Sequence, residues 1–205
     1  MPNDVLVHIV DDDEAVRESL AFLLDSASMA SRTYESAEAF LAALEQATSG
    51  CVVTDVRMPG MNGIDLLRHL RDAGRTIPMI VITGHGDVPL AVEAMKLGAF
   101  DFIEKPFDDE VLLHSIRSAL AHLSDGSQRE SERAAACERI ATLSARERDV
   151  LEGLVAGKPN KTIAFDLGIS PRTVEVYRAN LMTKMQASSL SELVRMSLMA
   201  SDLKG

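Results

Sequence analysis

Short apolar runs alternate with segments of helical spacing through the first 124 residues of the chain. The apolar runs are mostly β-branched, which favours strands, and the intervening segments repeat apolar residues every three or four positions, which favours helices. The predicted strands are 5–10, 29–34, 51–55, 79–83 and 100–104, and the predicted helices are 14–24, 36–47, 64–73, 89–97 and 109–123. This alternation predicts an α/β fold with a doubly wound five-stranded parallel sheet.

The pattern changes after residue 124. The segment 124–127 interrupts the last helical segment, and the residues after it are charged and alanine-rich without a strong apolar face. We therefore predict a linker with helical tendency over 125–140. Beyond the linker only helical periodicity is present, and the predicted helices are 145–155, 161–167, 172–186 and 190–200. The chain is thus predicted to hold two domains, residues 1–124 and a small all-α domain over 141–205.

Acidic residues follow two of the predicted strands. Asp11 and Asp12 come directly after the first strand, and Asp55 ends the third. In a parallel sheet of strand order 2-1-3-4-5, the first and third strands are neighbours, and ligands bind at their C-terminal ends. Clustered carboxylates repel one another and favour a divalent cation, and oxygen ligands with open positions suit Mg²⁺. The sequence therefore predicts a Mg²⁺ site at this edge of the sheet.

Two further residues close predicted strands at the same edge. Thr83 ends the fourth strand and Lys105 follows the fifth. A lysine can neutralise phosphoryl oxygens, and a threonine hydroxyl can donate a hydrogen bond to one. Together with a carboxylate nucleophile and a cation site, they predict that Asp55 receives a phosphoryl group. Asp13 is interpreted as a helix-start residue, because acids are favoured in the first turn of a helix.

With these residues, the segment 4–124 resembles the CheY-like receiver domains of two-component response regulators. The resemblance implies that Asp55 accepts a phosphoryl group from the phosphohistidine of a sensor kinase, and that Thr83 and Lys105 contact it. It also implies a cis Lys105–Pro106 peptide bond and a dimerisation face formed by the fourth helix, fifth strand and fifth helix. The implied switch residues are Thr83 and Phe102, and the implied Mg²⁺ ligands are Asp11, Asp12, Asp55 and the backbone carbonyl of Arg57.

The second domain contains a helix-turn-helix pattern. Ser144 and Glu147 match a capping box that precedes an apolar helical series. A short helix then ends at Gly168, and Ser170 with Pro171 supplies the N-cap and first residue of a new helix. Two helices joined by a glycine-containing turn form the layout that places a recognition helix in the major groove of DNA. Because the domain is nearly neutral, its composition fits a protein-interaction adaptor equally well.

The second domain resembles the LuxR-type four-helix output domain over residues 141–205. The resemblance rests on the segments 143–147, 160–164 and 170–176. It implies that Glu175 and Val176 face the edges of the bases. It assigns phosphate or groove contacts to Lys161, Ser170, Arg172, Thr173, Arg178 and Lys184.

The two domains in this order resemble response regulators of the NarL/FixJ family, and the segments 81–89, 160–161 and 172–176 are most similar to the FixJ group. That group implies a transcriptional activator that accepts a phosphoryl group from a FixL-like sensor histidine kinase. It further implies homodimers when phosphorylated, binding to promoter DNA, cooperation with RNA polymerase, and control of nitrogen-fixation or microaerobic genes. Regulators of other pathways share these motifs, so another pathway is kept as an alternative. Activation by dimerisation and activation by unmasking of the second domain are both kept.

The enzyme alternative is a metal-dependent phosphatase with an aspartyl nucleophile, which could use the same acids and lysine. The chain offers no dedicated substrate cap domain for such an enzyme, and it carries the helix-turn-helix pattern. We therefore expect a phosphoacceptor with at most slow self-dephosphorylation, and not an enzyme.

Composition and charge agree with two domains that have different partners. Of the 205 residues, 46% are hydrophobic and 25% are charged, as in ordinary globular proteins. Residues 1–124 carry 9 basic and 20 acidic residues, a net charge of −11, whereas residues 125–205 carry 12 and 11, a net charge of +1. The two distant cysteines predict free thiols in a reducing compartment. The N-terminus lacks the basic flank of a signal peptide and no apolar run reaches the roughly 20 residues that span a bilayer, so a cytoplasmic protein without a membrane partner is expected.

Overall fold

The computed structural model describes residues 6–44, 50–84, 88–124 and 126–201. The strands are β1 (Leu6–Val10), β2 (Ser31–Tyr34), β3 (Gly50–Asp55), β4 (Met79–Gly84) and β5 (Asp101–Lys105). The helices of the alternating part are α1 (Glu14–Ser26), α2 (Ala37–Ala42), α3 (Gly63–Asp72), α4 (Val88–Leu97) and α5 (Asp109–Ser124). The helices that follow are α6 (Gly126–Ala141), α7 (Ala145–Val155), α8 (Asn160–Leu167), α9 (Pro171–Met185) and α10 (Leu190–Ser201).

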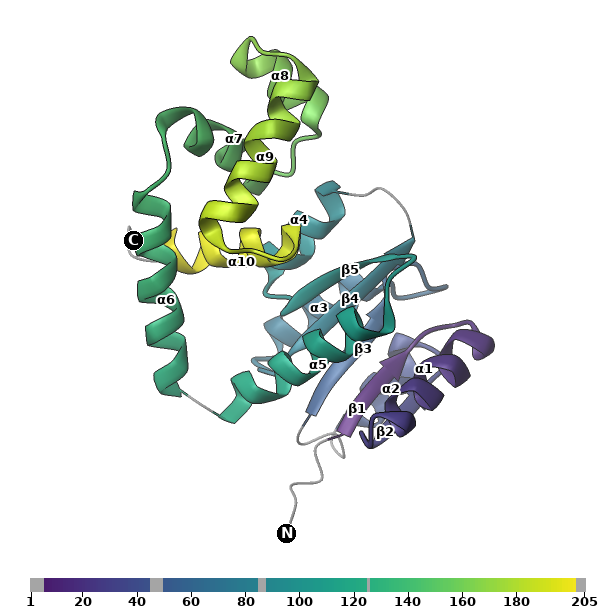
Figure 1. The fold of residues 1–205 in the computed structure, drawn as a ribbon. Helices are drawn as coiled ribbons and strands as arrows, with labels where there is room; N and C mark the ends of the chain where they lie inside the picture. Colours follow the sequence, from purple (N-terminus) through teal and green to yellow (C-terminus); the bar gives the residue numbers. More distant parts are fainter. Residues whose placement is uncertain (1–5, 45–49, 85–87, 125, 202–205) are drawn as a thin grey trace. The chain divides into compact units, whose positions relative to one another are not determined.

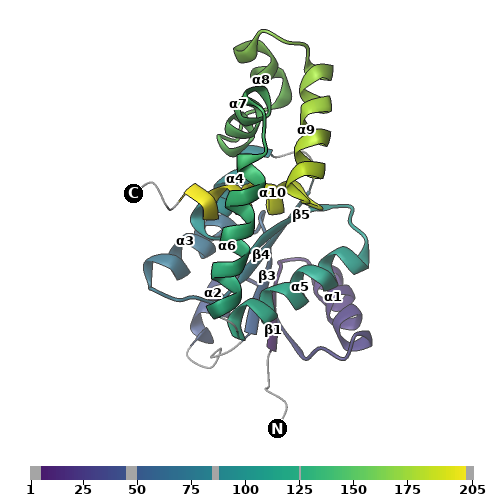
Figure 2. The ribbon, with the colours of Figure 1, turned by 60° about the vertical axis from the view of Figure 1, so that its left-hand side comes forward.

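The five strands form one parallel sheet in the order β2-β1-β3-β4-β5, which confirms the predicted topology (Figures 1 and 2). β3 lies at the centre, and its first five residues are buried. A central strand covered on both faces needs apolar side chains at every position, and this explains the uninterrupted run that ends at Asp55.

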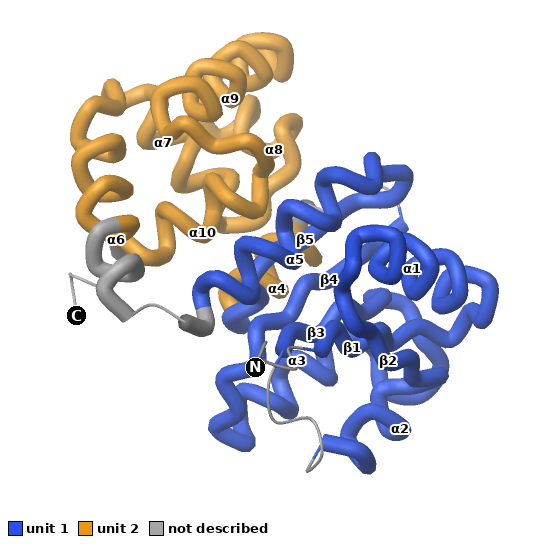
Figure 3. Tube along the Cα trace, turned by 60° about the horizontal axis from the view of Figure 1, so that its bottom comes forward, with its two compact units in different colours: residues 1–86, 97–124 blue, residues 87–96, 125–205 orange. Residues whose placement is uncertain are grey.

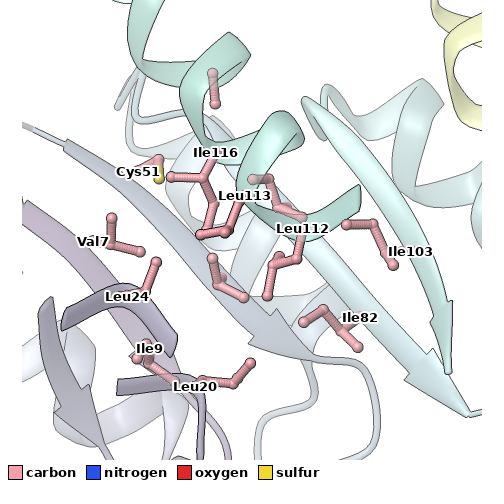
Figure 4. Close-up of a cluster of buried hydrophobic side chains, with 13 residues drawn as sticks. Val7, Ile9, Leu20, Leu24, Cys51, Ile82, Ile103, Leu112, Leu113 and Ile116 are labelled. Carbon is pink, nitrogen blue, oxygen red and sulfur yellow. The ribbon is translucent and has the colours of Figure 1, made fainter. Parts of the chain in front are cut away.

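Helices cover both faces of the sheet. Figures 1 and 2 show α1 and α5 on one face and α2 and α3 on the other. Alternate residues of four strands pack against α1 and α5 in one buried cluster, part of which is labelled in Figure 4. The cluster consists of Val7, Ile9, Leu20, Leu24, Cys51, Val53, Ile80, Ile82, Ile103, Leu112, Leu113, Ile116 and Ala119. On the opposite face, the ring of Phe40 in α2 contacts the rings of His8 and Tyr34.

Local sequence signals define where several helices begin. The Asp13 side chain accepts a hydrogen bond from the Ala15 backbone N–H at 2.9 Å, so Asp13 is the N-cap of α1, as interpreted. Ser36 and Asn62 cap α2 and α3 in the same manner. The predicted helix 36–47 is shorter in the structure, where α2 ends at Ala42. Residues 45–47 of that prediction lie outside the described residues.

The described chain divides into two compact units, drawn in different colours in Figure 3. One unit consists of residues 1–86 and 97–124, and the other of residues 87–96 and 125–205. The helical part of the second unit has its own hydrophobic core, which unites residues of α6 to α10. Its buried members are Ala136, Leu143, Val150, Leu151, Leu154, Ile163, Ala164, Val174, Leu181, Met185, Ala187, Leu193 and Met196.

The segment predicted as a linker is a continuous helix over most of its length. α6 spans Gly126–Ala141, and its Ala136 side chain is fully buried in the helical core. Arg139 binds the end of α9, because its guanidinium donates to the Met185 carbonyl at 3.1 Å and to Gln186 Oε1 at 2.7 Å. The second half of α6 is therefore part of the packed helical unit.

Both cysteines are free thiols. Cys51 is completely buried in β3, and burial raises the pKa of its thiol to about 12. Cys137 is half-buried in α6. Among the described residues, no helix combines the length and apolar character that crossing a membrane requires.

Candidate functional site

The strand register brings the predicted phosphoryl site together at one edge of the sheet. Val10 pairs with Thr54, and Asp55 pairs with Ile82, so the residues after β1 and at the end of β3 lie side by side. The end of β4 pairs with the end of β5, where Lys105 is opposite Gly84. The sheet itself therefore positions Asp11, Asp55, Thr83 and Lys105, as the order of strands and acids predicted.

Lys105 lies between two of the acids. Its Nζ is 2.8 Å from Asp55 Oδ1 and 3.8 Å from Asp11 Oδ2. The Lys105 side chain keeps 34% of its surface exposed, whereas the two carboxylates are largely buried. A cation held against a carboxylate at the mouth of the site can also meet an incoming phosphoryl oxygen.

The surroundings of Asp11 disfavour its negative charge. Burial raises the pKa of its carboxyl group, and the negative charges of Asp55 and Asp12 raise it further. The Asp13 backbone N–H, which donates to Asp11 Oδ1 at 2.9 Å, and the charge of Lys105 oppose this change. Three negative groups at two neighbouring strand ends repel one another, and a bound cation would relieve that repulsion.

The second oxygen of Asp55 is fixed by the turn that follows β3. The Arg57 backbone N–H donates to Asp55 Oδ2 at 2.6 Å. The turn is held in place by a second residue, because Glu38 Oε1 accepts a hydrogen bond from the Met61 backbone N–H at 3.0 Å. Gly63, where α3 begins, lies so close to the Asp55 carbonyl oxygen that any side chain there would clash with it. The orientation of the Asp55 carboxylate is therefore built into the backbone.

The donor set fits a hard divalent cation. Asp11 and Asp55 present carboxylate oxygens on adjacent strands, and Asp12 and the Arg57 carbonyl flank them in the sequence. Oxygen ligands of this kind suit Mg²⁺. Asp12 is exposed, and within the described residues no three His, Cys, Asp or Glu side chains come together closely enough to hold a metal ion. The structure thus brings together Asp11, Asp55 and Lys105, and Asp12 lies at the rim.

The hydrogen bonds given for the two predicted switch residues, Thr83 and Phe102, go to partners other than Asp55. Thr83 is fully buried, and its hydroxyl donates to the Gly84 carbonyl at 3.1 Å. Phe102 is half-buried in β5, which is separated from β3 and its Asp55 by β4. The peptide bond between Lys105 and Pro106 is cis, as the resemblance implied.

A groove next to Lys105 was not apparent from the sequence. It has a volume of about 550 Å³ and lies between α1 and the segment that follows β5. Its lining includes Ala15, Ser19, Phe22, Leu23, Lys105, Pro106 and Phe107. Phe22 is 76% exposed because it lies off the apolar face that buries Leu20 and Leu24. The sequence signal that could have indicated this groove is Phe22, an aromatic residue on the polar face of α1.

The helical unit contains the predicted helix-turn-helix. α8 ends at Gly168, whose φ of 65° lies in the left-handed region that glycine adopts easily. α9 begins after Ser170, whose Oγ accepts a hydrogen bond from the Thr173 backbone N–H at 3.1 Å. Lys161, Arg172, Glu175 and Val176 are exposed, and Ser170 and Thr173 lie at the start of α9.

Two of the predicted DNA contacts also hold the helices together. Arg178 Nη1 donates to Asn160 Oδ1 at 3.0 Å and so joins α9 to the start of α8. Lys184 Nζ donates to Glu147 Oε2 at 2.8 Å and joins α9 to α7. Glu147 also completes the predicted capping box with Ser144. These hydrogen bonds, of which the one from Lys184 has the largest effect, lower the pKa of the Glu147 carboxyl group to about 2.

Comparison with known proteins agrees with the geometry of both parts. Residues 7–117 match the family described as "Response regulator receiver domain", and residues 141–197 match "Bacterial regulatory proteins, luxR family". The chain is 60% identical to the transcriptional regulatory protein FixJ of Azorhizobium caulinodans, over 98% of this chain and 95% of that protein. It is 57% identical to FixJ of Rhizobium meliloti, over 95% of this chain and 96% of that protein.

A solved structure extends the similarity to nearly the whole fold. Full-length FixJ from B. japonicum aligns with a TM-score of 0.59 and 53% sequence identity, covering 97% of this chain and 98% of that one. This chain and full-length FixJ therefore share the order of the two domains, the parallel sheet and the helix-turn-helix. The chain belongs to the NarL/FixJ family of two-component response regulators and is closely related to FixJ.

Proposed function

We propose that this protein is a transcriptional activator that is switched on when Asp55 accepts a phosphoryl group from a sensor histidine kinase. The observation that carries the proposal is the contact of Lys105 Nζ with Asp55 Oδ1 at 2.8 Å, with Asp11 at the same sheet edge. The proposal divides the chain into a receiver domain (1–124), a linker (125–140) and a DNA-binding domain (141–205). From DNA as the proposed partner, we infer that the protein acts in the cytoplasm.

The proposed chemistry is transfer of a phosphoryl group between two side chains. An oxygen of Asp55 attacks the phosphorus of the kinase phosphohistidine. A P–O bond forms while the P–N bond breaks, and the imidazole keeps the electron pair and takes up a proton. The Arg57 N–H holds the carboxylate in a fixed orientation during this step.

The charge of the phosphoryl group needs positive partners. Lys105 already faces Asp55, and Thr83 can reach the new oxygens when its hydroxyl turns from the Gly84 carbonyl. Asp11, Asp12, Asp55 and the Arg57 carbonyl would hold Mg²⁺, which when bound supplies positive charge to the phosphoryl oxygens. We infer at most slow self-dephosphorylation, as expected of a phosphoacceptor that works as a switch.

The groove beside Lys105 is the proposed docking place of the kinase. It opens next to the phosphoacceptor, and Phe22 offers an apolar side chain that is 76% exposed. The donor histidine must come within bonding distance of Asp55. Because the groove is lined by Lys105, which contacts Asp55, a kinase that binds in the groove can bring its histidine to the site. By similarity to the FixJ proteins, we infer a FixL-like kinase.

Phosphorylation adds a charge of about −1.5 to −2 at the strand end, and we infer that Thr83 and Phe102 respond to it. Two routes to the output are proposed. In one, the phosphorylated protein dimerises and places two recognition helices on promoter half-sites. In the other, the receiver domain releases the DNA-binding domain. Either route leads to promoter DNA and to cooperation with RNA polymerase, and similarity to FixJ favours nitrogen-fixation or microaerobic genes as targets.

The test is Asp55→Asn, which keeps the size of the side chain but removes the nucleophile. Treatment with phosphoramidate is expected to add one phosphoryl group to the native protein, to produce dimers and to increase promoter binding. The variant is expected to show none of these effects, as measured by intact mass spectrometry, light scattering and gel shift. Full activation of Asp55→Asn by the phosphodonor would refute the proposed switch.

The matched control is Asp72→Asn, which alters an exposed acid at the end of α3 and should leave all three responses intact. Genome-wide footprinting of the phosphorylated protein would then identify the regulated genes. Sites upstream of genes unrelated to nitrogen fixation or oxygen supply would reject that pathway and retain the switch.

A further inference from the structure

Arg17 stands near the start of α1, where a cation is electrostatically unfavourable. It is the fourth residue of the helix, and its backbone N–H donates to the Asp13 carbonyl at 3.0 Å, which closes the first turn. The dipole of a helix favours acids near this end and disfavours cations. The first residue of α1, Glu14, is an acid and follows this rule. The arginine three residues later therefore needs an explanation of its own.

The Arg17 guanidinium binds the loop that carries two of the acids. Side chains on a helix lean towards its N-terminus, so a long side chain at this position lies over the residues that precede the helix. Arg17 Nη1 donates to the Asp11 carbonyl at 2.8 Å and to the Asp12 carbonyl at 3.0 Å. One charged group thus binds two consecutive carbonyls and joins α1 to the loop after β1.

The bond from Arg17 completes the set of contacts that fix Asp11. The Asp11 backbone N–H donates to the Tyr34 carbonyl at 3.2 Å, and its Oδ1 accepts a hydrogen bond from the Asp13 N–H at 2.9 Å. With its carbonyl bound by Arg17, Asp11 is held through three of its groups. Its second carboxylate oxygen, Oδ2, lies 3.8 Å from Lys105 Nζ. The backbone and one oxygen are thus fixed, and the other oxygen faces the site.

Asp12 depends on Arg17 more strongly. Its side chain is exposed, and the bond from Arg17 to its carbonyl is the one hydrogen bond that Asp12 makes within the described residues. Ordering a free segment on binding costs conformational entropy, and a backbone that is already fixed reduces this cost. Arg17 therefore lowers the cost of using Asp12 as a ligand.

The charge of Arg17 is not used to neutralise the acids. Within the described part of the chain, the guanidinium binds backbone carbonyls and forms no ion pair. An arginine that paired with the Asp11 or Asp12 carboxylate would compete with a divalent cation for the same oxygens. A partner that binds ligand residues from outside and leaves their oxygens available is the usual way in which metal ligands are oriented.

We propose that Arg17 is a positioning residue of the Mg²⁺ site, which holds Asp11 and Asp12 in place for the cation through their backbone carbonyls. The inference rests on the proposed phosphoacceptor function and adds a residue that acts on the cation through two others. Arg17 does not line the groove beside Lys105, so this role is separate from the proposed docking of the kinase.

A role through position and a role through charge predict opposite results. Removing a positive charge near three acids strengthens their attraction for a divalent cation, so charge alone predicts that Arg17→Gln binds Mg²⁺ more tightly. Loss of a partner that orients metal ligands weakens metal binding instead. We expect weaker binding, because both acids lose a bond that fixes their backbone.

The experiment measures the Kd for Mg²⁺ of the full-length protein by NMR titration, followed at the backbone amide signals of residues 11–13. Arg17→Gln is expected to raise the Kd by about 10- to 100-fold. Arg17→Lys keeps a charged donor without the guanidinium fork and should recover part of the loss. Arg71→Gln is the matched control, because it removes the same charge from an exposed arginine at the C-terminal end of α3, and it should leave the Kd unchanged.

Two further measurements separate positioning from a general effect on stability. Mg²⁺ raises the thermal midpoint of a protein that binds it, and at equal Mg²⁺ concentration the increase should be smaller for Arg17→Gln than for the native protein. Labelling by phosphoramidate should be slower in the variant at low Mg²⁺ and approach the native rate when Mg²⁺ is saturating. A purely structural role would lower the midpoint equally with and without Mg²⁺ and leave the Mg²⁺ dependence of labelling unchanged.

The outcomes distinguish this inference from the function on which it rests. Weaker Mg²⁺ binding by Arg17→Gln, with partial recovery in Arg17→Lys, would establish it. A Kd for Arg17→Gln equal to or below that of the native protein would overturn it, and the proposed function would stand as long as the native protein is labelled. Native protein that neither binds Mg²⁺ nor is labelled by phosphoramidate would overturn both. Should circular dichroism show that Arg17→Gln is unfolded, Arg17→Lys decides, and an unchanged Kd in that variant would overturn the inference.

Discussion

Asp11 is buried at the end of β1, and burial together with the charges of Asp55 and Asp12 raises the pKa of its carboxyl group above the ordinary 3.8. An acid with a raised pKa in the folded state binds its proton more tightly there than in the unfolded chain. The free energy of unfolding therefore falls as the pH rises through this range, and Asp11 destabilises the receiver domain at neutral pH. The Asp11 carboxylate serves cation binding, and its negative charge is kept although it lowers the stability of the fold.

We predict that Asp11→Asn raises the thermal midpoint of the receiver domain by about 2–5 °C at neutral pH without Mg²⁺. The amide oxygen can still accept the hydrogen bond from the Asp13 backbone N–H, and the buried negative charge is gone. Thermal melts followed by calorimetry measure the change. The same variant should show a much weaker response to phosphoramidate.

The control for this prediction is Asp12→Asn, which removes an acid from an exposed position at the same strand end. Its thermal midpoint should change less than that of Asp11→Asn. A lower midpoint for Asp11→Asn than for the native protein would show that the Asp11 carboxylate stabilises the fold, contrary to the argument from burial.

At the scale of elements, the inner strands β1, β3 and β4 were predicted well because a buried parallel strand needs a continuous apolar run. The predicted strand 51–55 differs from β3 by one residue, since Gly50 also belongs to the strand. The site at the C-terminal edge could be predicted for the same reason, because the strand order determines which strand ends are neighbours. Periodicity and strand order thus account for the positions of Asp11, Asp55 and Lys105.

Contacts between side chains that are distant in the sequence could not be predicted in this way. Glu38 accepts a hydrogen bond from the turn after β3, and Arg139 donates one to the end of α9. Both bonds join elements that no local pattern connects. The extent of α6 is a similar case. Its low apolar content predicted a linker with helical tendency, whereas the buried Ala136 shows that the helix packs through a small side chain.

The link between α7 and α9 gives the helical unit a specific dependence on pH. The Lys184 ammonium and the two groups of Ser144 that donate to Glu147 hold the pKa of Glu147 near 2, below its ordinary 4.5. A lowered pKa contributes stability above pH 4.5, and that contribution is lost as the pH falls from 4.5 towards about 2. The contact that holds the recognition helix α9 against α7 thus depends on the negative charge of Glu147.

We predict that Glu147→Gln lowers the stability of the helical unit at neutral pH and that the difference from the native protein disappears near pH 2. The glutamine can replace the capping interaction in part, and it cannot form the ion pair with Lys184. Amide hydrogen exchange in α7 and α9, measured as a function of pH, resolves this unit from the receiver. Glu152→Gln, an exposed acid of the same helix, is the control. An unchanged difference between the variant and the native protein at pH 2 would contradict the assignment to Glu147.

For the whole molecule, the separation of charge is the most prominent property. The receiver domain carries a net charge of −11, and the residues from 125 onward carry +1. A tethered acidic domain repels DNA phosphates and reduces the affinity of its neighbour for DNA, although salt limits the effect to a Debye length of about 8 Å at physiological ionic strength. The charge of the receiver therefore opposes DNA binding in the unphosphorylated protein.

We predict that a fragment starting at residue 125 binds promoter DNA without phosphorylation, several-fold more tightly than the unphosphorylated full-length protein at low salt. The fragment keeps all members of its hydrophobic core, which runs from Ala136 to Met196. The advantage should shrink as salt is added, because screening weakens the repulsion by the receiver. Gel shifts over a salt series measure both quantities. A folded fragment that does not bind at low salt would exclude unmasking as the route of activation.

The two cysteines have a practical consequence for spectroscopy. The Cys51 thiol is enclosed in the centre of the sheet with a pKa raised to about 12, so at neutral pH it supplies almost no thiolate. Cys137 is half-buried in α6. A maleimide dye added to the native chain should therefore attach at Cys137 alone. The protein carries, without any engineering, a single attachment point for a fluorophore on the helix that joins its input to its output.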